Sequence, residues 1–161
     1  ISLLKSKGIN IDKNEEYNIL FEGLRFTKMD FSTGHLVYLA KDFPDVSFEQ
    51  HIDFDKFYKS LSKLNLPKNV RLFSNKINLK FLKEQLKDGP VIIYIDIFIL
   101  ERVYHYSHFV ILSEIKDDKS IIYDPWFGKK TILKTKDIMK SISFLRNKIK
   151  ISPKLIKVII I

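Results

Sequence analysis

The chain has 161 residues, of which 45 % are hydrophobic and 29 % charged, the balance of an ordinary globular protein with one core. It contains no cysteine, which excludes a disulfide framework, a thiolate metal site and a cysteine nucleophile supplied by these residues. The longest apolar run, 91–100, is too short to span a bilayer, which needs about 20 apolar residues. No secretory signal is visible at the N-terminus, so we expect a cytoplasmic protein without a transmembrane segment.

Positive charge is concentrated near the C-terminus. Residues 1–128 carry 18 basic and 18 acidic residues, whereas residues 129–161 carry ten basic residues and only one acidic residue, Asp137. We expect the basic residues of 129–157 to form a solvated face on one side of the fold, beside any groove. Binding of an anionic partner through this face is the less favoured alternative.

Apolar residues at helical spacing predict several helices in the first half of the chain. They cover 1–7, a segment that begins near Asp12 or Asn14 and runs to about 24, 35–41, and 54–64, with Ser32-Thr33-Gly34 as a break before the third. Alternating apolar residues predict a strand at 46–52 and a short one at 70–73. The first helix lacks its opening turns and residue 1 is Ile, so we expect the native chain to begin further upstream.

The second half of the chain predicts an antiparallel sheet. A helix precedes the continuous apolar strand 91–100, which we expect to lie in the interior of the sheet because both of its faces are apolar. A polar turn at 116–119 joins the next two strands. The remaining predicted elements are the helix 78–88, the strands 107–115, 120–124, 131–133 and 156–161, and a helix capped by Thr135. Helices followed by an antiparallel sheet indicate one α+β domain over residues 1–161.

The strongest candidate site is formed by His108 and Asp124. His108 begins an apolar strand, and Asp124 ends the next strand sixteen residues later. A carboxylate that accepts a hydrogen bond from one imidazole nitrogen orients the ring and leaves the other nitrogen free to act as a base. A regular ladder closed at 116–119 places Asp124 opposite Ile111, on the face that His108 does not share. A joint site therefore requires a bulge or an odd-length loop between 113 and 123; otherwise the two residues are a strand-end histidine and a turn aspartate.

The segments around these two residues resemble the His and Asp segments of papain-like cysteine peptidases. The greatest similarity is to family thirty-nine, the double-glycine leader peptidases found on bacteriocin-exporting transporters, with their stand-alone relatives. The matching features, in family order, are the helix 78–88, Gly89-Pro90, the strand 91–100, His108-Phe109-Val110-Ile111-Leu112, Asp124-Pro125 and Gly128. Segment 131–142 is similar to the family's next strand and helix, and residues 1–8 to the tail of its first helix.

The resemblance implies a papain-like fold in which N-terminal helices pack on a C-terminal antiparallel sheet. It also implies that His108 is the general base and Asp124 the residue that orients it. The family's nucleophilic Cys and the Gln of its oxyanion hole would both fall before residue 1, so the chain as given is expected to be inactive. We also expect the first helix to point its N-terminal end toward His108.

Other polar residues predict weaker sites. His105 and His108 are three apart on an extended segment and make a poor metal pair. We expect His35 to be a cap-region residue, His51 to face solvent and Asp96 to be a buried charge held by Arg102 or a backbone donor. Trp126 and its neighbouring tyrosines, which could line a peptide groove, are expected to belong to the core.

Three functions remain open at this stage. The first is a peptidase-like domain that acts on a peptide or protein substrate, and the second is a non-catalytic domain of the same fold that binds peptides or a partner protein. The third, a basic nucleic-acid-binding domain using 129–157, is ranked last because no glycine-rich or aromatic-ladder pattern accompanies the lysines. No cofactor or metal site is predicted.

Overall fold

The computed structural model describes residues 1–26 and 30–160, without the side chains of Ser6, Leu20, Leu24 and Phe26. Strands from both halves of the chain join one seven-stranded sheet in the order β2-β1-β7-β3-β4-β5-β6. The strands are β1 (Val46–Ile52), β2 (Val70–Ser74), β3 (Val91–Asp96), β4 (Ser107–Lys116), β5 (Lys119–Asp124), β6 (Lys129–Lys134) and β7 (Lys154–Ile160). The mixed α+β class predicted from the sequence is confirmed.

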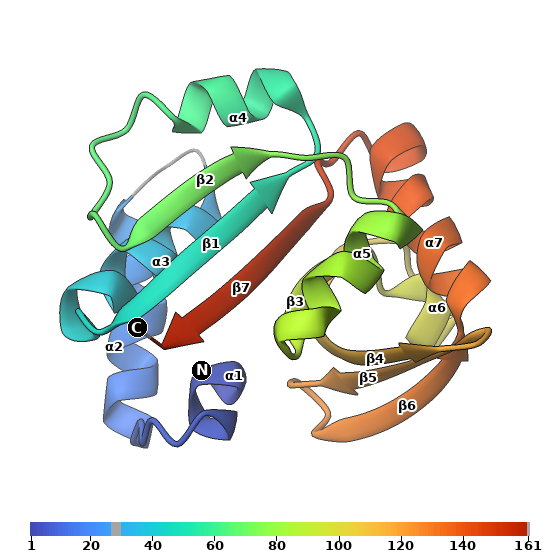
Figure 1. The fold of residues 1–161 in the computed structure, drawn as a ribbon, viewed down its shortest axis with the longest axis horizontal. Helices are drawn as coiled ribbons and strands as arrows, with labels where there is room; N and C mark the ends of the chain where they lie inside the picture. The colour runs from blue at the N-terminus through green and yellow to red at the C-terminus, as the bar shows by residue number, and fades with distance from the viewer. Residues whose placement is uncertain (27–29, 161) are drawn as a thin grey trace.

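Helices cover both halves of this sheet (Figure 1). They are α1 (Ser2–Ser6), α2 (Lys13–Phe26), α3 (Phe31–Asp42), α4 (Asp55–Leu61), α5 (Leu79–Gln85), α6 (Phe98–Glu101) and α7 (Thr135–Phe144). Short turns of 3-10 helix (Leu86–Asp88) and π-helix (Leu145–Ile149) extend α5 and α7. No helix in the described ranges is long and apolar enough to cross a membrane.

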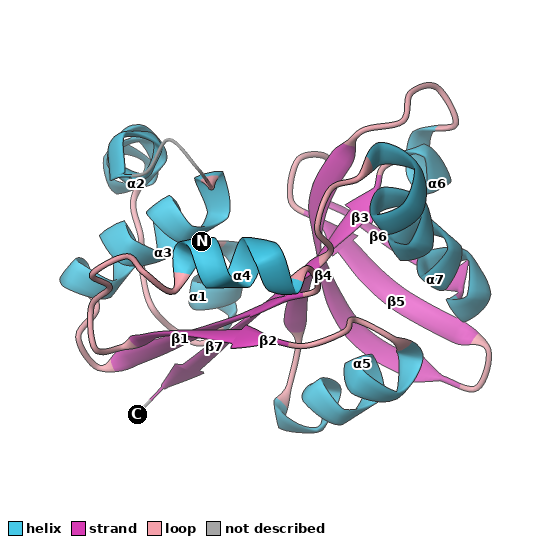
Figure 2. Ribbon diagram, turned by 90° about the horizontal axis from the view of Figure 1, so that it is seen from above, coloured by secondary structure: helices cyan, strands magenta, loops and turns pink. Residues whose placement is uncertain are grey.

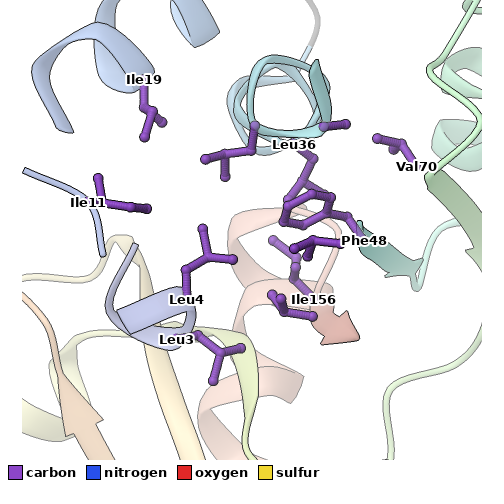
Figure 3. Close-up of a cluster of buried hydrophobic side chains, with 12 residues drawn as sticks. Leu3, Leu4, Ile11, Ile19, Leu36, Phe48, Val70 and Ile156 are labelled. Atoms are coloured by element: carbon purple, nitrogen blue, oxygen red, sulfur yellow. The ribbon is translucent and has the colours of Figure 1, made fainter. Parts of the chain in front are cut away.

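The sheet bends where its two halves meet. β3 and β7 pair only at Ile92↔Ile156 and Ile93↔Leu155, and Figure 2 shows β1, β2 and β7 inclined steeply to β3–β6. Each half has its own apolar cluster. One cluster holds α1, α2 and α3 against β1 and β7, with Leu4, Phe48 and Ile156 near its centre (Figure 3). The other packs α5 and α7 against β3, β4 and β5.

Two predictions about the sheet need correction. The sheet is not a purely C-terminal antiparallel one, because β1 and β2 come from the first half of the chain and pair in parallel. β1 also pairs antiparallel with β7 over seven residues. The predicted strand 91–100 ends at Asp96; it is interior, between β7 and β4, but its last four residues belong to or adjoin α6.

Two predicted helix starts are also wrong. Residues Ser32–Gly34 do not break a helix but lie inside α3, because the Asp30 side chain accepts the Thr33 backbone N–H at 2.9 Å and starts the helix at Phe31. Thr135 does not cap α7, since the N-cap residue is Lys134. The Thr135 hydroxyl lies 3.0 Å from that of Ser120 on β5 instead.

Candidate functional site

His108 and Asp124 form a buried pair at one end of the sheet. His108 Nε2 lies 3.0 Å from Asp124 Oδ1, and the two side chains are only 6 % and 4 % exposed. The same oxygen accepts the backbone N–H of Trp126 at 2.9 Å, which fixes the carboxylate. In the part of the chain that the structure describes, no hydrogen bond reaches His108 Nδ1, and Asp124 Oδ2 is buried without a partner. The predicted hydrogen-bond contact between the pair is therefore confirmed.

A β-bulge puts both side chains on one face. The ladder runs regularly from Lys116↔Lys119 to Glu114↔Ile121, and then resumes at Leu112↔Ile122. Ser113 is thus an extra residue on β4, and its hydroxyl donates to the Ile121 carbonyl at 3.2 Å. The extra residue changes the alternation of β4 by one position, as the sequence count required. The predicted bulge is confirmed.

Trp126 packs against His108. Its ring lies 4.9 Å from the His108 ring, centroid to centroid, at an angle of 51°. The indole itself is 70 % exposed, so the prediction that Trp126 belongs to the core is wrong. It follows Pro125 in the turn after β5, and it lines a groove there.

A groove of about 610 Å³ lies between the helices of the first half and the sheet. Neither His108 nor Asp124 lines this groove, which adjoins the pair through Trp126, whereas Asp124 lines a second groove with Val103 and Phe127. One wall of the first groove is the N-terminal end of α1, where Ile1, Ser2 and Leu3 lie, and the opposite wall includes Pro125 and Trp126. Figure 1 likewise shows α1 beside the end of β5. The rest of the lining is largely apolar and aromatic, with Tyr17, Phe31, Ile92, Phe109 and Ile111. Such a lining suits an apolar or aromatic ligand, including a peptide.

A second His–Asp pair lies at the junction of β3 and α6. His105 Nδ1 is 2.7 Å from Asp96 Oδ2, and the His105 ring is stacked between Phe98 and Phe144 at centroid distances of 4.2 and 4.3 Å. Asp96 is buried, as predicted, but the side chain that contacts its carboxylate is that of His105 rather than Arg102. The Phe98 backbone N–H also donates to Asp96, at 3.3 Å. The pair was not predicted because the two residues are nine apart across α6, whose residues have the apolar pattern of a strand.

A buried polar network joins α3 to the middle of the sheet. Asp30 contacts the Lys154 ammonium and accepts the Ser32 hydroxyl at 2.9 Å, while Gln50 donates to that hydroxyl at 2.8 Å. Burial by itself would raise the pKa of Asp30, but Lys154 and the hydrogen bonds from Thr33 and Ser32 bring it below its ordinary value. Nothing in the sequence pairs residues 30, 50 and 154, which meet only once β1 and β7 are aligned.

The other two histidines, His51 and His35, each lie within hydrogen-bond distance of an oxygen atom of the same chain. His51 does not face solvent, as predicted, but is 6 % exposed and stacks on Phe73 at 4.9 Å. Its Nδ1 lies 2.8 Å from Asn75 Oδ1, and burial lowers the pKa of the ring. His35 is in the first turns of α3, where its Nδ1 lies 2.6 Å from the Phe31 carbonyl oxygen.

The basic residues of 129–157 do not form one solvated face. Lys154 and Lys157 are buried, and Lys157 contacts Asp88 at 2.5 Å. Arg146 donates to both carboxylate oxygens of Asp53, at 2.8 and 2.7 Å. These three cations form ion pairs with carboxylates of the same chain. They therefore do not add to a basic surface that could bind phosphate groups, which weakens the nucleic-acid alternative further. Within the described residues, no group of three His, Asp or Glu side chains could hold a metal ion.

Comparison of the chain with protein-family models, with curated proteins and with solved structures found no match.

Proposed function

We propose that the chain is a cysteine-peptidase-like domain of papain-like fold that cleaves or binds peptides, with His108 as general base and Asp124 as the residue that orients it. The observation that carries the proposal is the buried contact between these two side chains, together with Trp126, which packs against the His108 ring and lines a groove that begins at α1. Burial matters because a carboxylate holds an imidazole in one tautomer most effectively where water does not compete.

The proposed chemistry follows from the two ring nitrogens. With its proton on Nε2, His108 donates to Asp124 Oδ1 and presents a lone pair at Nδ1. Nδ1 takes the proton of a thiol, the thiolate attacks a peptide carbonyl, and the imidazolium then gives the proton to the leaving amine. Asp124 holds the ring through Nε2, and the Trp126 ring packs against the His108 ring.

The 161 residues supply the base and the carboxylate of this mechanism but not the nucleophile, because they include no cysteine. In this proposal the thiol comes from outside them and is delivered at the N-terminal end of α1, which lines the groove. These residues alone are therefore expected to show no peptide hydrolysis.

The second candidate is a non-catalytic domain of the same fold that binds peptides or a partner protein. The apolar and aromatic lining of the groove favours it, since binding requires that surface but no thiol. The two candidates differ in whether the His108 imidazole can activate a thiol placed at the start of α1.

An engineered thiol tests this difference. The Ile1→Cys variant places the only thiol of the chain in the wall of the groove, and its alkylation by iodoacetamide is followed as a function of pH with and without His108→Ala. We expect His108 to favour the thiolate, so that alkylation persists below the usual thiol pKa of about 8.5.

The matched control is Lys7→Cys, at the opposite end of α1, whose alkylation should not depend on His108. Identical pH profiles for Ile1→Cys with and without His108 would contradict the peptidase-like proposal and leave the binding domain.

A further inference from the structure

Two neighbouring loops expose apolar side chains at one end of the sheet. One is the loop 102–106 before β4, and the other is the turn 125–128 after β5. Because β4 and β5 are antiparallel, the start of one lies beside the end of the other, and both loops line a common groove through Val103 and Phe127. Four large side chains of the two loops are mostly exposed: Val103 60 %, Tyr104 68 %, Trp126 70 % and Phe127 60 %.

Basic residues accompany these side chains. Arg102 directly precedes Val103 and Tyr104. Lys129 and Lys130 follow shortly after Trp126 and Phe127. All three are exposed, and residues 102–106 and 125–130 contain no Asp or Glu. Lys129 lines the groove of Val103 and Phe127, and the ammonium of its neighbour Lys130 lies 5.8 Å from the centre of the Tyr123 ring on β5. We call this surface, formed by residues 102–104, 126, 127, 129 and 130, the aromatic–basic tip.

The composition of the tip indicates which kind of partner it fits. Exposed apolar side chains gathered in one place mark either a protein interface or a membrane contact. Protein interfaces are enriched in aromatic residues and arginine but depleted in lysine. Trp and Tyr at the level of the lipid headgroups, with lysines beside them, are instead the pattern of a surface that lies on a bilayer.

We propose that the aromatic–basic tip binds the surface of an anionic lipid bilayer. Trp126 and Phe127 enter the headgroup region with Val103 and Tyr104, while Lys129, Lys130 and Arg102 lie against the negatively charged headgroups. The tip is small, so the contact is peripheral and reversible, and it weakens as salt screens the charges. This proposal does not depend on the peptidase-like function.

The single tryptophan of the chain makes a direct test possible, because Trp126 is the only source of indole fluorescence. The protein is mixed with vesicles of phosphatidylcholine, with or without an equimolar amount of phosphatidylserine, and both sedimentation with the vesicles and Trp126 emission are measured. We expect binding and a shift of the emission to shorter wavelength only with phosphatidylserine. Brominated lipid should quench that emission.

Charge variants separate the tip from the overall positive charge. Lys129→Ala with Lys130→Ala should weaken the vesicle affinity about thirty-fold, at about five-fold for each lysine near an anionic surface. The control removes two exposed lysines in or beside α4, Lys56→Ala with Lys63→Ala, which changes the net charge equally. α4 lies over the other half of the sheet (Figure 1), so this variant should bind nearly as well as the unmodified protein.

Several outcomes would overturn the proposal. Absence of binding to phosphatidylserine vesicles is one, and equal weakening by the two double variants is another, because it would show a non-specific charge effect. Binding without a change in Trp126 emission would place the contact elsewhere on the molecule. A shift of Trp126 emission by an acidic peptide, such as polyglutamate, but not by vesicles would assign the tip to a protein partner.

Discussion

Replacing Asp124 with alanine should destabilise the protein strongly, although the residue lies at the end of a strand. Its carboxylate accepts hydrogen bonds from His108 Nε2 and from the Trp126 backbone N–H, and it is 4 % exposed. A hydrogen bond to a charged group contributes about 1.5–3 kcal/mol, so the loss of both predicts about 3–6 kcal/mol. The loss is large because His108 stays buried with a donor that water does not reach.

Urea unfolding at pH 7 measures this loss as a change in the free energy of unfolding. The Asp124→Asn variant sharpens the test. It keeps an acceptor for His108, but its amide N–H₂ takes the place of Oδ2, which has no partner among the described residues. We therefore expect Asp124→Asn to be destabilised too, by about 1–3 kcal/mol. Asp118→Ala, in the exposed hairpin turn, is the matched control and should stay within about 0.5 kcal/mol.

A second readout follows the histidine itself. Nitrogen NMR distinguishes the Nε2–H tautomer from the Nδ1–H tautomer, and we expect the former in the unmodified protein and a mixture in Asp124→Ala. If Asp124→Ala unfolds at the same urea concentration as the unmodified protein and the tautomer does not change, the pair is not formed in solution.

Three further predictions concern ionisable groups that are buried or half-buried. The pKa of Asp30 is lowered despite burial, chiefly by Lys154, so its contribution to stability is present above the ordinary value of 3.8 and is lost as the pH falls below it. Asp30→Asn should therefore lower stability at pH 6 much more than at the acid end, and an equal loss throughout would refute this. Burial lowers the pKa of His51, so stability should decline as the pH falls below 6.5, where the unfolded chain takes up a proton first. His51→Phe should flatten that decline in urea unfolding curves; an unchanged slope would show that His51 is not its source. Arg146→Lys loses the two-point contact with Asp53 and should cost about 1–3 kcal/mol in the same assay, whereas a loss below 0.5 kcal/mol would mean that lysine restores the contact.

Local sequence patterns identified most elements but not how distant ones pair. The strand at 46–52 has the predicted bounds, and the apolar strand that begins at Val91 is interior as predicted. The parallel pairing of β1 with β2 joins residues 22 positions apart, such as Phe48 and Val70. The position of β7 between β1 and β3 depends on contacts over longer separations, 64 positions for Ile92 and Ile156 and more than a hundred between β1 and β7. Periodicity reports which face of an element is apolar, and it carries no information about its neighbour in the sheet.

The candidate site shows the same limit at smaller scale. The sequence identified His108 and Asp124, and counting along a regular ladder showed that a bulge was needed, but no apolar pattern located the bulge. The extra residue is Ser113, whose hydroxyl bonds to the Ile121 carbonyl, so one polar residue in an apolar strand was the available sign. The exposure of Trp126 was mispredicted because a large aromatic side chain is usually buried on average, whereas this one packs against the His108 ring and stays 70 % exposed.

The two proposals meet at Trp126, whose ring packs against His108 and is also the centre of the aromatic–basic tip. A substitution of Trp126 would therefore alter both the peptidase-like site and the tip, and it could not distinguish the two proposals. Asp124 is buried, and its described side-chain hydrogen bonds are those to His108 and to the Trp126 backbone N–H. Lys129 and Lys130 are exposed and make no contact with His108 among the described interactions. Loss of vesicle binding in the lysine variants, with an unchanged His108 tautomer, would assign the tip a role of its own. If Asp124→Ala instead changes the His108 tautomer while vesicle binding is retained, the buried pair serves chemistry or stability rather than the membrane contact.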